Sequence, residues 1–362
     1  MANVALECDL GEIDGDVKVQ REKHGETRIC AVSPTLPHRP VDMQTEVPKP
    51  PTPLSQDDIV IQYGLHSVQG HRAEMEDDHK CVHKGQADPL TPAGTDQEDG
   101  KFDQDDDNYT PQPNTSFFGV YDGHAGTAAA NFLRKNLHRV ILRHPKLLEE
   151  PELAAKEGIA KVEDDFMQYA EEQRLDAGST LAIVLIIGTD LIVANVGDSE
   201  VVLNRKGTPM VLTTIHNMKK NEKEEDRIRK LGGRIHHKRL GHPKYNPSFF
   251  SIAVTRSIGD VFFKTGKFTE GKDSGLIADA DTRKVTLTKD DRFVIMGCDG
   301  LWDVMTHQQA VDFTEVRVGQ GKTCQTISEE LVNEALALGS TDNITALVIT
   351  LRPPKPRINP SG

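Results

Sequence analysis

Cysteine and long apolar runs are both scarce in this sequence of 362 residues. Its five cysteines are odd in number and scattered, so they do not resemble a disulfide framework and indicate a reducing, intracellular location in the cytoplasm or nucleus. No apolar run reaches the roughly 18 to 20 residues that a membrane helix needs, and we expect no membrane association. The N-terminus lacks the basic and apolar segments of a signal peptide, and Ala2 stands where N-myristoylation requires glycine.

Basic residues are fewer than acidic ones, 43 against 56. The formal net charge is −13, which argues against nucleic-acid binding because such proteins need a basic face. Part of the excess is local, since residues 96–110 contain seven acids and one lysine. This run lacks the glycine and terminal glutamate of an EF-hand loop, and we interpret it as a solvated acidic insertion at about residues 85–115. Heptads and an obvious apolar patch are lacking too, so we expect a monomer.

Composition divides the chain into three parts. Residues 1–58 are rich in proline and lack periodicity, which is typical of a mostly flexible tail. Residues 59–352 alternate β-branched runs with amphipathic segments and are predicted to form the folded domain, which includes a basic, flap-like segment at about 234–251. Residues 353–362 form a polar C-terminal tail.

The folded part has the pattern of an α+β layered domain. The predicted strands are 59–63, 117–121, 180–187, 191–196, 201–205, 284–288, 292–297 and 344–351. Short turns join several of them, which indicates antiparallel hairpins. The predicted helices are 127–142, 151–173, 222–233 and 326–338. Helices between hairpin runs favour antiparallel sheets covered by helices.

Acidic residues recur where these strands meet turns. Asp122, Asp198 and Asp299 follow three apolar runs, and Asp342 precedes a fourth. A single Asp-Gly pair is a common turn, but four such positions indicate a shared site. Clustered carboxylates repel one another and raise their own pKa values, and a hard divalent cation such as Mg²⁺ or Mn²⁺ relieves that repulsion.

A second acidic segment, 75–78, contributes to the same hypothesis. It follows Arg72, whose guanidinium fork matches two phosphate oxygens. Arg72 stands four residues before Glu76, a spacing that predicts both side chains on one face of a strand or helix. Together these residues suggest metal-assisted phosphate chemistry, in which two ions clamp a phosphoryl group.

Seven motifs occur in order over about 280 residues: RAEMEDDH, FFGVYDGHAG, DAGSTLAIVLI, LIVANVGDSEVVL, IAVTRSIGD, FVIMGCDGLWDVM and GSTDNITALVI. With these motifs the chain resembles the metal-dependent serine/threonine protein phosphatases of the type 2C (PP2C), or PPM, family. The resemblance covers about residues 59–351 and implies a β-sandwich of two antiparallel sheets flanked by helices on both outer faces. It also implies hydrolysis of phosphoserine and phosphothreonine proteins by a hydroxide that bridges two Mg²⁺ or Mn²⁺ ions.

The resemblance implies a set of metal ligands. Asp122 would bridge the two ions. The Gly123 carbonyl and Glu76 would complete the second ion, and Asp299 and Asp342 would hold the first. A third, looser ion would be held by Asp198, Asp299 and Asp303.

The remaining roles that the resemblance implies concern the substrate. Asp77 would act through metal-bound water, Arg72 would bind the substrate phosphate, and His124 would be the general acid for the leaving alkoxide. Asp260 matches a family motif, and its role stays open between a structural one and support of the site.

The chain departs from the family pattern at three places. Glu200 stands where the family usually has arginine, Ala125 where it has glycine, and Ile215 where it has aspartate. The first two remove no ligand, whereas the third affects the segment beside the flap. His236, His237 and His242 in the flap are interpreted as exposed loop residues rather than zinc ligands.

The main alternative function is a non-catalytic PP2C-like binding or scaffolding module. Loss of a metal ligand would favour that alternative, and no carboxylate matched to a ligand position is missing. The sequence therefore favours an active enzyme.

Overall fold

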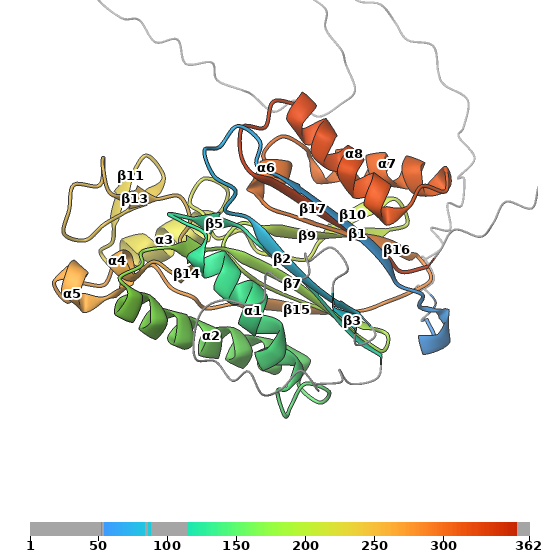
Figure 1. The fold of residues 1–362 in the computed structure, drawn as a ribbon, viewed down its shortest axis with the longest axis horizontal. Coiled ribbons are helices and arrows are strands. Elements are labelled where there is room, and N and C mark those ends of the chain that lie inside the picture. Colours follow the sequence, from blue (N-terminus) through green and yellow to red (C-terminus); the bar gives the residue numbers. More distant parts are fainter. Residues whose placement is uncertain (1–51, 53, 84–85, 88–113, 353–362) are drawn as a thin grey trace, which may run out of the picture. The chain divides into compact units, whose positions relative to one another are not determined.

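The computed structural model describes residue 52 and residues 54–83, 86–87 and 114–352 (Figure 1). The N-terminal tail up to residue 51, most of the acidic insertion and the C-terminal tail lie outside the described residues. A buried Leu54 and a short 3-10 helix, η1 (Gln56–Asp58), precede the first strand.

Two antiparallel sheets form the centre of the domain (Figure 1). The six-stranded sheet has the order β15-β8-β7-β4-β2-β3, with β15 Asp281–Thr286, β8 Asp190–Val196, β7 Leu181–Ile187, β4 Thr115–Tyr121, β2 Asp78–His83 and β3 Gln86–Ala87. The five-stranded sheet has the order β1-β17-β16-β9-β10, with β1 Gln62–Val68, β17 Ile344–Thr350, β16 Asp291–Gly297, β9 Glu200–Arg205 and β10 Thr208–Val211. This arrangement confirms the predicted sandwich.

Helices cover both outer faces of the sandwich. Helices α1 (Ala128–Leu142) and α2 (Pro151–Gln173) pack on the six-stranded sheet. Helices α7 (His307–Gly319) and α8 (Cys324–Ala337) pack on the five-stranded sheet. Figure 1 shows these helix pairs on opposite sides of the two sheets. No helix of the described ranges combines the length and the apolar character needed to cross a membrane.

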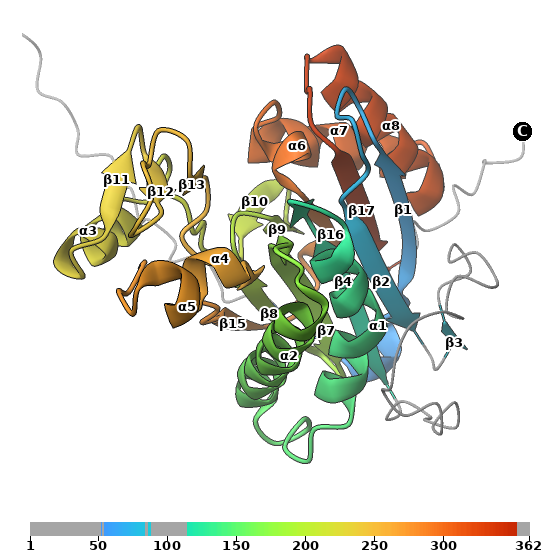
Figure 2. The same ribbon diagram turned by 60° about the vertical axis from the view of Figure 1, so that its left-hand side comes forward.

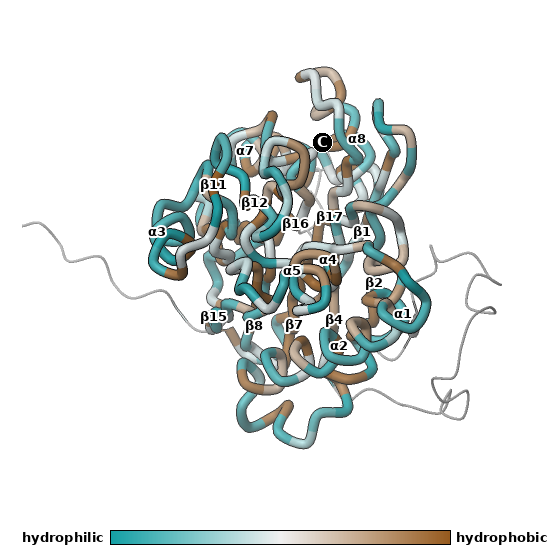
Figure 3. The backbone as a smooth tube through the Cα atoms, turned by 90° about the vertical axis from the view of Figure 1, so that its left-hand side faces the viewer, coloured by the Kyte–Doolittle hydropathy of each residue, from teal (hydrophilic) through white to brown (hydrophobic). Residues whose placement is uncertain are grey.

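Strand residues alternate between the inner and outer faces of each sheet, as the two-residue period of a strand requires. Phe118 and Val120 of β4 lie in the core between the sheets, whereas Phe117 and Tyr121 face α1 and α2. Both faces are therefore buried, which explains the continuous apolar runs in the sequence. Figure 3 shows brown, hydrophobic strands inside a mostly teal, hydrophilic exterior.

The elements differ from the prediction in several places, of which three illustrate the causes. The first strand lies at 62–68 rather than 59–63, because Ile59 and Ile61 pack against the inter-sheet core from a segment outside the ladder. Strand β2 was missed because polar residues interrupt its short apolar stretch. Helix α7 was missed although Thr306 and Gln309 form a capping box at its start.

A smaller lobe carries the predicted flap (Figure 2). It contains α3 (Glu222–Lys230), the three-stranded sheet β11 (Arg234–His236), β12 (Arg239–Gly241) and β13 (Ser251–Ile252), and the short helices α4 (Val261–Lys264) and α5 (Gly266–Thr269). Its own core centres on Met218, Ile228 and Leu240. A third small sheet, β14-β6-β5, joins Ile258–Gly259, Gly178–Ser179 and Gly123–His124.

Candidate active site

The four aspartates at strand ends all lie beside the two central sheets. Asp122 follows β4, and Asp198 lies in the turn between β8 and β9. Asp299 begins the short helix α6 (Asp299–Trp302) directly beyond β16, and Asp342 precedes β17 by two residues. The strand-end positions predicted from sequence are therefore those of the structure.

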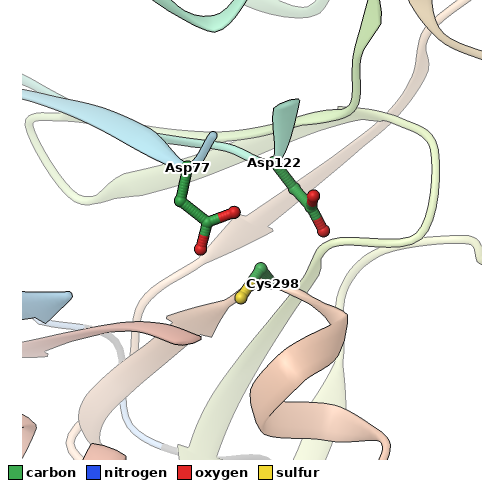
Figure 4. Close-up of side chains that lie close together, drawn as sticks. All are labelled: Asp77, Asp122 and Cys298. Atoms are coloured by element: carbon green, nitrogen blue, oxygen red, sulfur yellow. The ribbon is translucent and has the colours of Figure 1, made fainter. Parts of the chain in front are cut away.

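Asp77 and Asp122 lie close together, beside Cys298. One oxygen of each and the Cys298 sulfur lie within 4.8 Å of one another, and Figure 4 shows the three side chains facing a common space. Asp77 Oδ2 accepts a hydrogen bond from Thr345 Oγ1 at 2.7 Å. Its Oδ1 is buried without a hydrogen-bond partner, an unmet need that a bound cation or water would satisfy.

The carboxylates at this edge carry more negative charge than the surrounding cations balance. Burial and the charges of Asp299 and Asp77 raise the pKa of Asp122 well above its usual range. Burial and the charge of Asp198 raise the pKa of Asp299 to about 8, and burial raises the pKa of Asp77 to about 6. Divalent cations bound between these groups would remove the repulsion.

The loop from 69 to 77 brings Arg72 and Glu76 to the same edge. It is neither strand nor helix, so the prediction that their spacing places both on one face was wrong. The Arg72 guanidinium instead donates to Asp342 Oδ2 at 2.6 Å, with 54% of its side chain exposed. Glu76 Oε1 accepts from the Gly126 backbone N–H at 2.6 Å.

Asn343 fixes the shape of that loop. Its Nδ2 donates to the Gln69 and Glu74 carbonyls at 2.8 and 2.9 Å, and its Oδ1 accepts from the Glu76 N–H at 2.8 Å. These bonds join segments more than 260 residues apart in sequence. Sequence reasoning gave Asn343 no role, and its position directly after Asp342 was the one available signal.

Gly123 has a steric reason to be glycine. A Cβ atom there would lie 2.3 Å from the Glu76 carbonyl oxygen, so any side chain would push the 69–77 loop away from Asp122. This close backbone approach places the main chain of Gly123 beside the segment that carries Glu76.

His124, which is half-buried, pairs with the buried carboxylate of Asp260. Its Nε2 lies 2.9 and 3.0 Å from the two carboxylate oxygens of Asp260. Ser257 Oγ also donates to Asp260 Oδ2, at 2.5 Å. Burial opposes the charged imidazole, but the Asp260 charge and hydrogen bond outweigh it and raise the pKa of His124. The structure thus places Asp260, whose role the sequence left open, against the predicted general acid.

Asp198 and Asp303 are each bound by a donor from the segment before α3. Asn217 Nδ2 donates to Asp198 Oδ2 at 2.9 Å, and the Lys220 ammonium lies 2.8 Å from Asp303 Oδ1. Asp303 directly follows α6, as the four-residue spacing from Asp299 predicted. Neither Asn217 nor Lys220 was identified from the sequence.

Cys298 is an apolar component of this edge rather than an evident ligand. Burial and the charges of Asp77 and Asp122 raise the pKa of its thiol well above the usual range. The thiol therefore keeps its proton, while hard divalent cations prefer oxygen ligands.

The flap histidines do not share one environment. His236 and His237 pack against each other, with ring centroids 4.2 Å apart. The expectation that His242 is exposed was wrong: it is fully buried, it stacks on Phe262, and its Nε2 lies 2.8 Å from the Phe262 carbonyl oxygen. Among the described residues, the flap contributes no histidine to a group of three close metal-binding side chains.

Comparisons with known proteins agree with this architecture. The family model described as protein phosphatase 2C matches residues 61–344. A rice protein named probable protein phosphatase 2C 27 is 32% identical over 308 residues, which cover 84% of this chain and 80% of the relative. Human protein phosphatase 1F is 32% identical over 298 residues, covering 80% of this chain and 57% of that protein.

A solved structure supports the same fold. The serine-threonine phosphatase 2C structure from Toxoplasma gondii aligns with a TM-score of 0.61 at 20% identity, covering 83% of this chain and 98% of that chain. The family match spans most of the chain and includes the covering helices, the strand-end aspartates and the central sheets except most of β17. This chain belongs to the protein phosphatase 2C family.

Proposed function

We propose that this chain is an active, metal-dependent phosphatase that hydrolyses phosphoserine and phosphothreonine monoesters in proteins. The observation that carries the proposal is the carboxylate cluster around Asp122, whose negative charges raise one another's pKa values. An Arg72–Asp342 ion pair at its border and a His124–Asp260 pair two residues beyond Asp122 add phosphate-binding and proton-donating groups. Like charges placed close together destabilise the folded chain, and a protein that only binds other proteins would gain nothing from them.

The donor set suits hard divalent ions. We assign Asp122, the Gly123 carbonyl and Glu76 to one Mg²⁺ or Mn²⁺ ion, and Asp122, Asp299 and Asp342 to the other, with Asp77 acting through bound water. The unpartnered Asp77 Oδ1 and the oxygen-rich composition support this assignment. Ions bound there would activate water as the nucleophile and stabilise charge on the phosphoryl group.

Arg72 is suited to bind the substrate phosphate. It has a half-exposed side chain at the cluster's border, and its guanidinium is held there by Asp342. Two oxygens of a phosphate dianion can accept parallel N–H bonds from a guanidinium, as the two oxygens of a carboxylate can, so Arg72 can donate to phosphate oxygens in place of Asp342. Arg72 would thus orient the phosphoryl group and balance its charge.

His124 is suited to protonate the leaving group. Asp260 occupies its Nε2, so Nδ1 is the nitrogen left to donate a proton to the serine or threonine oxygen. The raised pKa of His124 favours the protonated form that this step requires. Asp260 acts through His124, as a positioning residue.

The test is phosphate release from a phosphoserine peptide by the full chain, with Mg²⁺ or Mn²⁺ and then with excess chelator. We expect turnover with metal, loss of turnover with chelator, and no turnover for Asp122→Asn. Asp164→Asn on the exposed face of α2 removes the same charge away from the site and serves as the matched control. A folded chain that releases no phosphate with either metal would contradict the proposal and favour a non-catalytic module.

A further inference from the structure

The turn at residues 217–220 contacts Asp198 and Asp303, the two carboxylates that the family resemblance assigns only to the third ion. Asn217 Nδ2 donates to Asp198 Oδ2 at 2.9 Å, and Lys220 Nζ donates to Asp303 Oδ1 at 2.8 Å. The donors lie three residues apart in one short segment. A third ion at this position would compete with both of them.

Local hydrogen bonds hold this turn in place. Asn217 is buried, and its Oδ1 accepts from the backbone N–H groups of Lys219 and Lys220 at 3.1 and 2.9 Å. Asn221, the next residue, caps α3 by accepting from the Lys223 N–H at 3.0 Å. Its Nδ2 also donates to the Ile215 carbonyl at 2.7 Å. Lys220 therefore extends from a backbone fixed on both sides.

The ammonium of Lys220 lies in a field of several carboxylates. Burial disfavours its charge, but the hydrogen bond and charge of Asp303, with the charges of Glu200 and Asp198, raise the pKa of Lys220. Glu200 itself is buried and pairs with His307 Nε2 at 2.9 Å. The Lys220–Asp303 pair lies at the surface, with 38% of the Lys220 side chain and 56% of the Asp303 side chain exposed. This acidic group of residues thus already has, beside it, a positive charge that belongs to the chain.

We propose that the Lys220 ammonium takes the position of the third cation, and so further weakens the binding of a third divalent ion that the family resemblance already makes looser than the other two. The proposal rests on the two-ion site described under the proposed function. A divalent ion entering between Asp198 and Asp303 would have to displace the Lys220 ammonium or remain beside it. Even with the screening of bulk water, a unit and a divalent charge about 5 Å apart repel enough to weaken binding about tenfold.

The test is the number of Mn²⁺ ions bound by the full chain, measured by equilibrium dialysis with elemental analysis, without reference to activity. We expect two tightly bound ions in the parent chain. Lys220→Met, which keeps the aliphatic stem and removes the charge, should bind a third ion at least about tenfold more tightly than the parent does. Lys220→Arg, which keeps the charge, should resemble the parent.

Lys219→Met is the matched control, because Lys219 is the neighbouring lysine, is exposed as Lys220 is, and forms no ion pair with the described residues. It should bind Mn²⁺ as the parent does. Three tight ions in the parent, or an unchanged third affinity in Lys220→Met, would overturn the inference and leave the two-ion function standing. Fewer than two ions in the parent would contradict the proposed function and this inference together.

Discussion

Asp260→Asn should lower the pKa of His124 without changing the shape of the site. Asp260 has a left-handed backbone conformation, with φ of 62°, and asparagine tolerates that region as aspartate does. The amide oxygen can still accept from His124 Nε2. The substitution therefore removes the negative charge and keeps the acceptor.

The size of the effect follows from the contact. A hydrogen bond to a charged group contributes about 1.5–3 kcal/mol and a neutral one about 0.5–1.5 kcal/mol, so the charge accounts for about 1.3 kcal/mol, the difference between the midpoints. That difference lowers the pKa of His124 by about one unit. Bound metal ions would act on the parent and the variant alike, so the difference between them should persist in the loaded enzyme.

The assay is the pH profile of kcat at saturating Mn²⁺ with two substrates. Phosphopeptide hydrolysis needs protonated His124 and should decline as pH rises through its pKa, so this alkaline decline should begin about one pH unit lower in Asp260→Asn. Nitrophenyl phosphate has a leaving group that needs no proton, and its profile should not move. Asp164→Asn should match the parent with both substrates.

If the alkaline decline of kcat on the phosphopeptide occurs at the same pH in Asp260→Asn and the parent, the reasoning that Asp260 raises the pKa of His124 is refuted. An equal displacement with both substrates would show that the carboxylate acts on the nucleophile or the metals instead.

Three further predictions concern single side chains. His124→Ala should lower kcat on a phosphopeptide by about 10²- to 10⁴-fold and on nitrophenyl phosphate much less; equal losses would rule out the general-acid role. Asp299→Asn should abolish phosphopeptide turnover yet raise the melting temperature in excess chelator. The reason is that the substitution removes a carboxyl group whose charge is unfavourable in the folded chain, as its pKa, raised to about 8, indicates. A lowered melting temperature would contradict that account. Glu224→Gln should lower the free energy of unfolding at neutral pH by about 3 kcal/mol, measured by urea unfolding. Burial raises the pKa of Glu224, but hydrogen bonds from Arg256 and Arg227 outweigh that effect and lower the pKa from 4.5 to about 2. That stabilisation is present above pH 4.5 and is lost as pH falls toward about 2, so a parent chain whose stability is flat across this range would exclude it.

Local patterns were enough to predict the regular elements that carry their own signals. Helix α2 lies at 151–173, as predicted, because Pro151 at its first turn and a long amphipathic repeat define it. Strand β4 ends at Tyr121 because Asp122 and Gly123 end the apolar run. The first strand was misplaced because Ile59 and Ile61 are apolar for packing rather than for pairing.

The site depended on contacts that no local pattern contains. The strand-end aspartates could be found because each follows or precedes an apolar run. The His124–Asp260 pair joins residues 136 apart, and Asn343 bonds to the 69–77 loop across more than 260 residues. The Lys220–Asp303 pair likewise depends on how the segment before α3 folds back. A family resemblance can assign roles to matched positions, but such partners become visible only in the three-dimensional structure.

The central claim is that the acidic edge is a two-metal centre, and anomalous diffraction from crystals grown with Mn²⁺ tests it most directly. The account predicts two manganese peaks that share Asp122, one contacting Glu76 and the Gly123 carbonyl and the other contacting Asp299 and Asp342. Manganese peaks found only elsewhere on the molecule, or a fully ordered site without manganese, would contradict it.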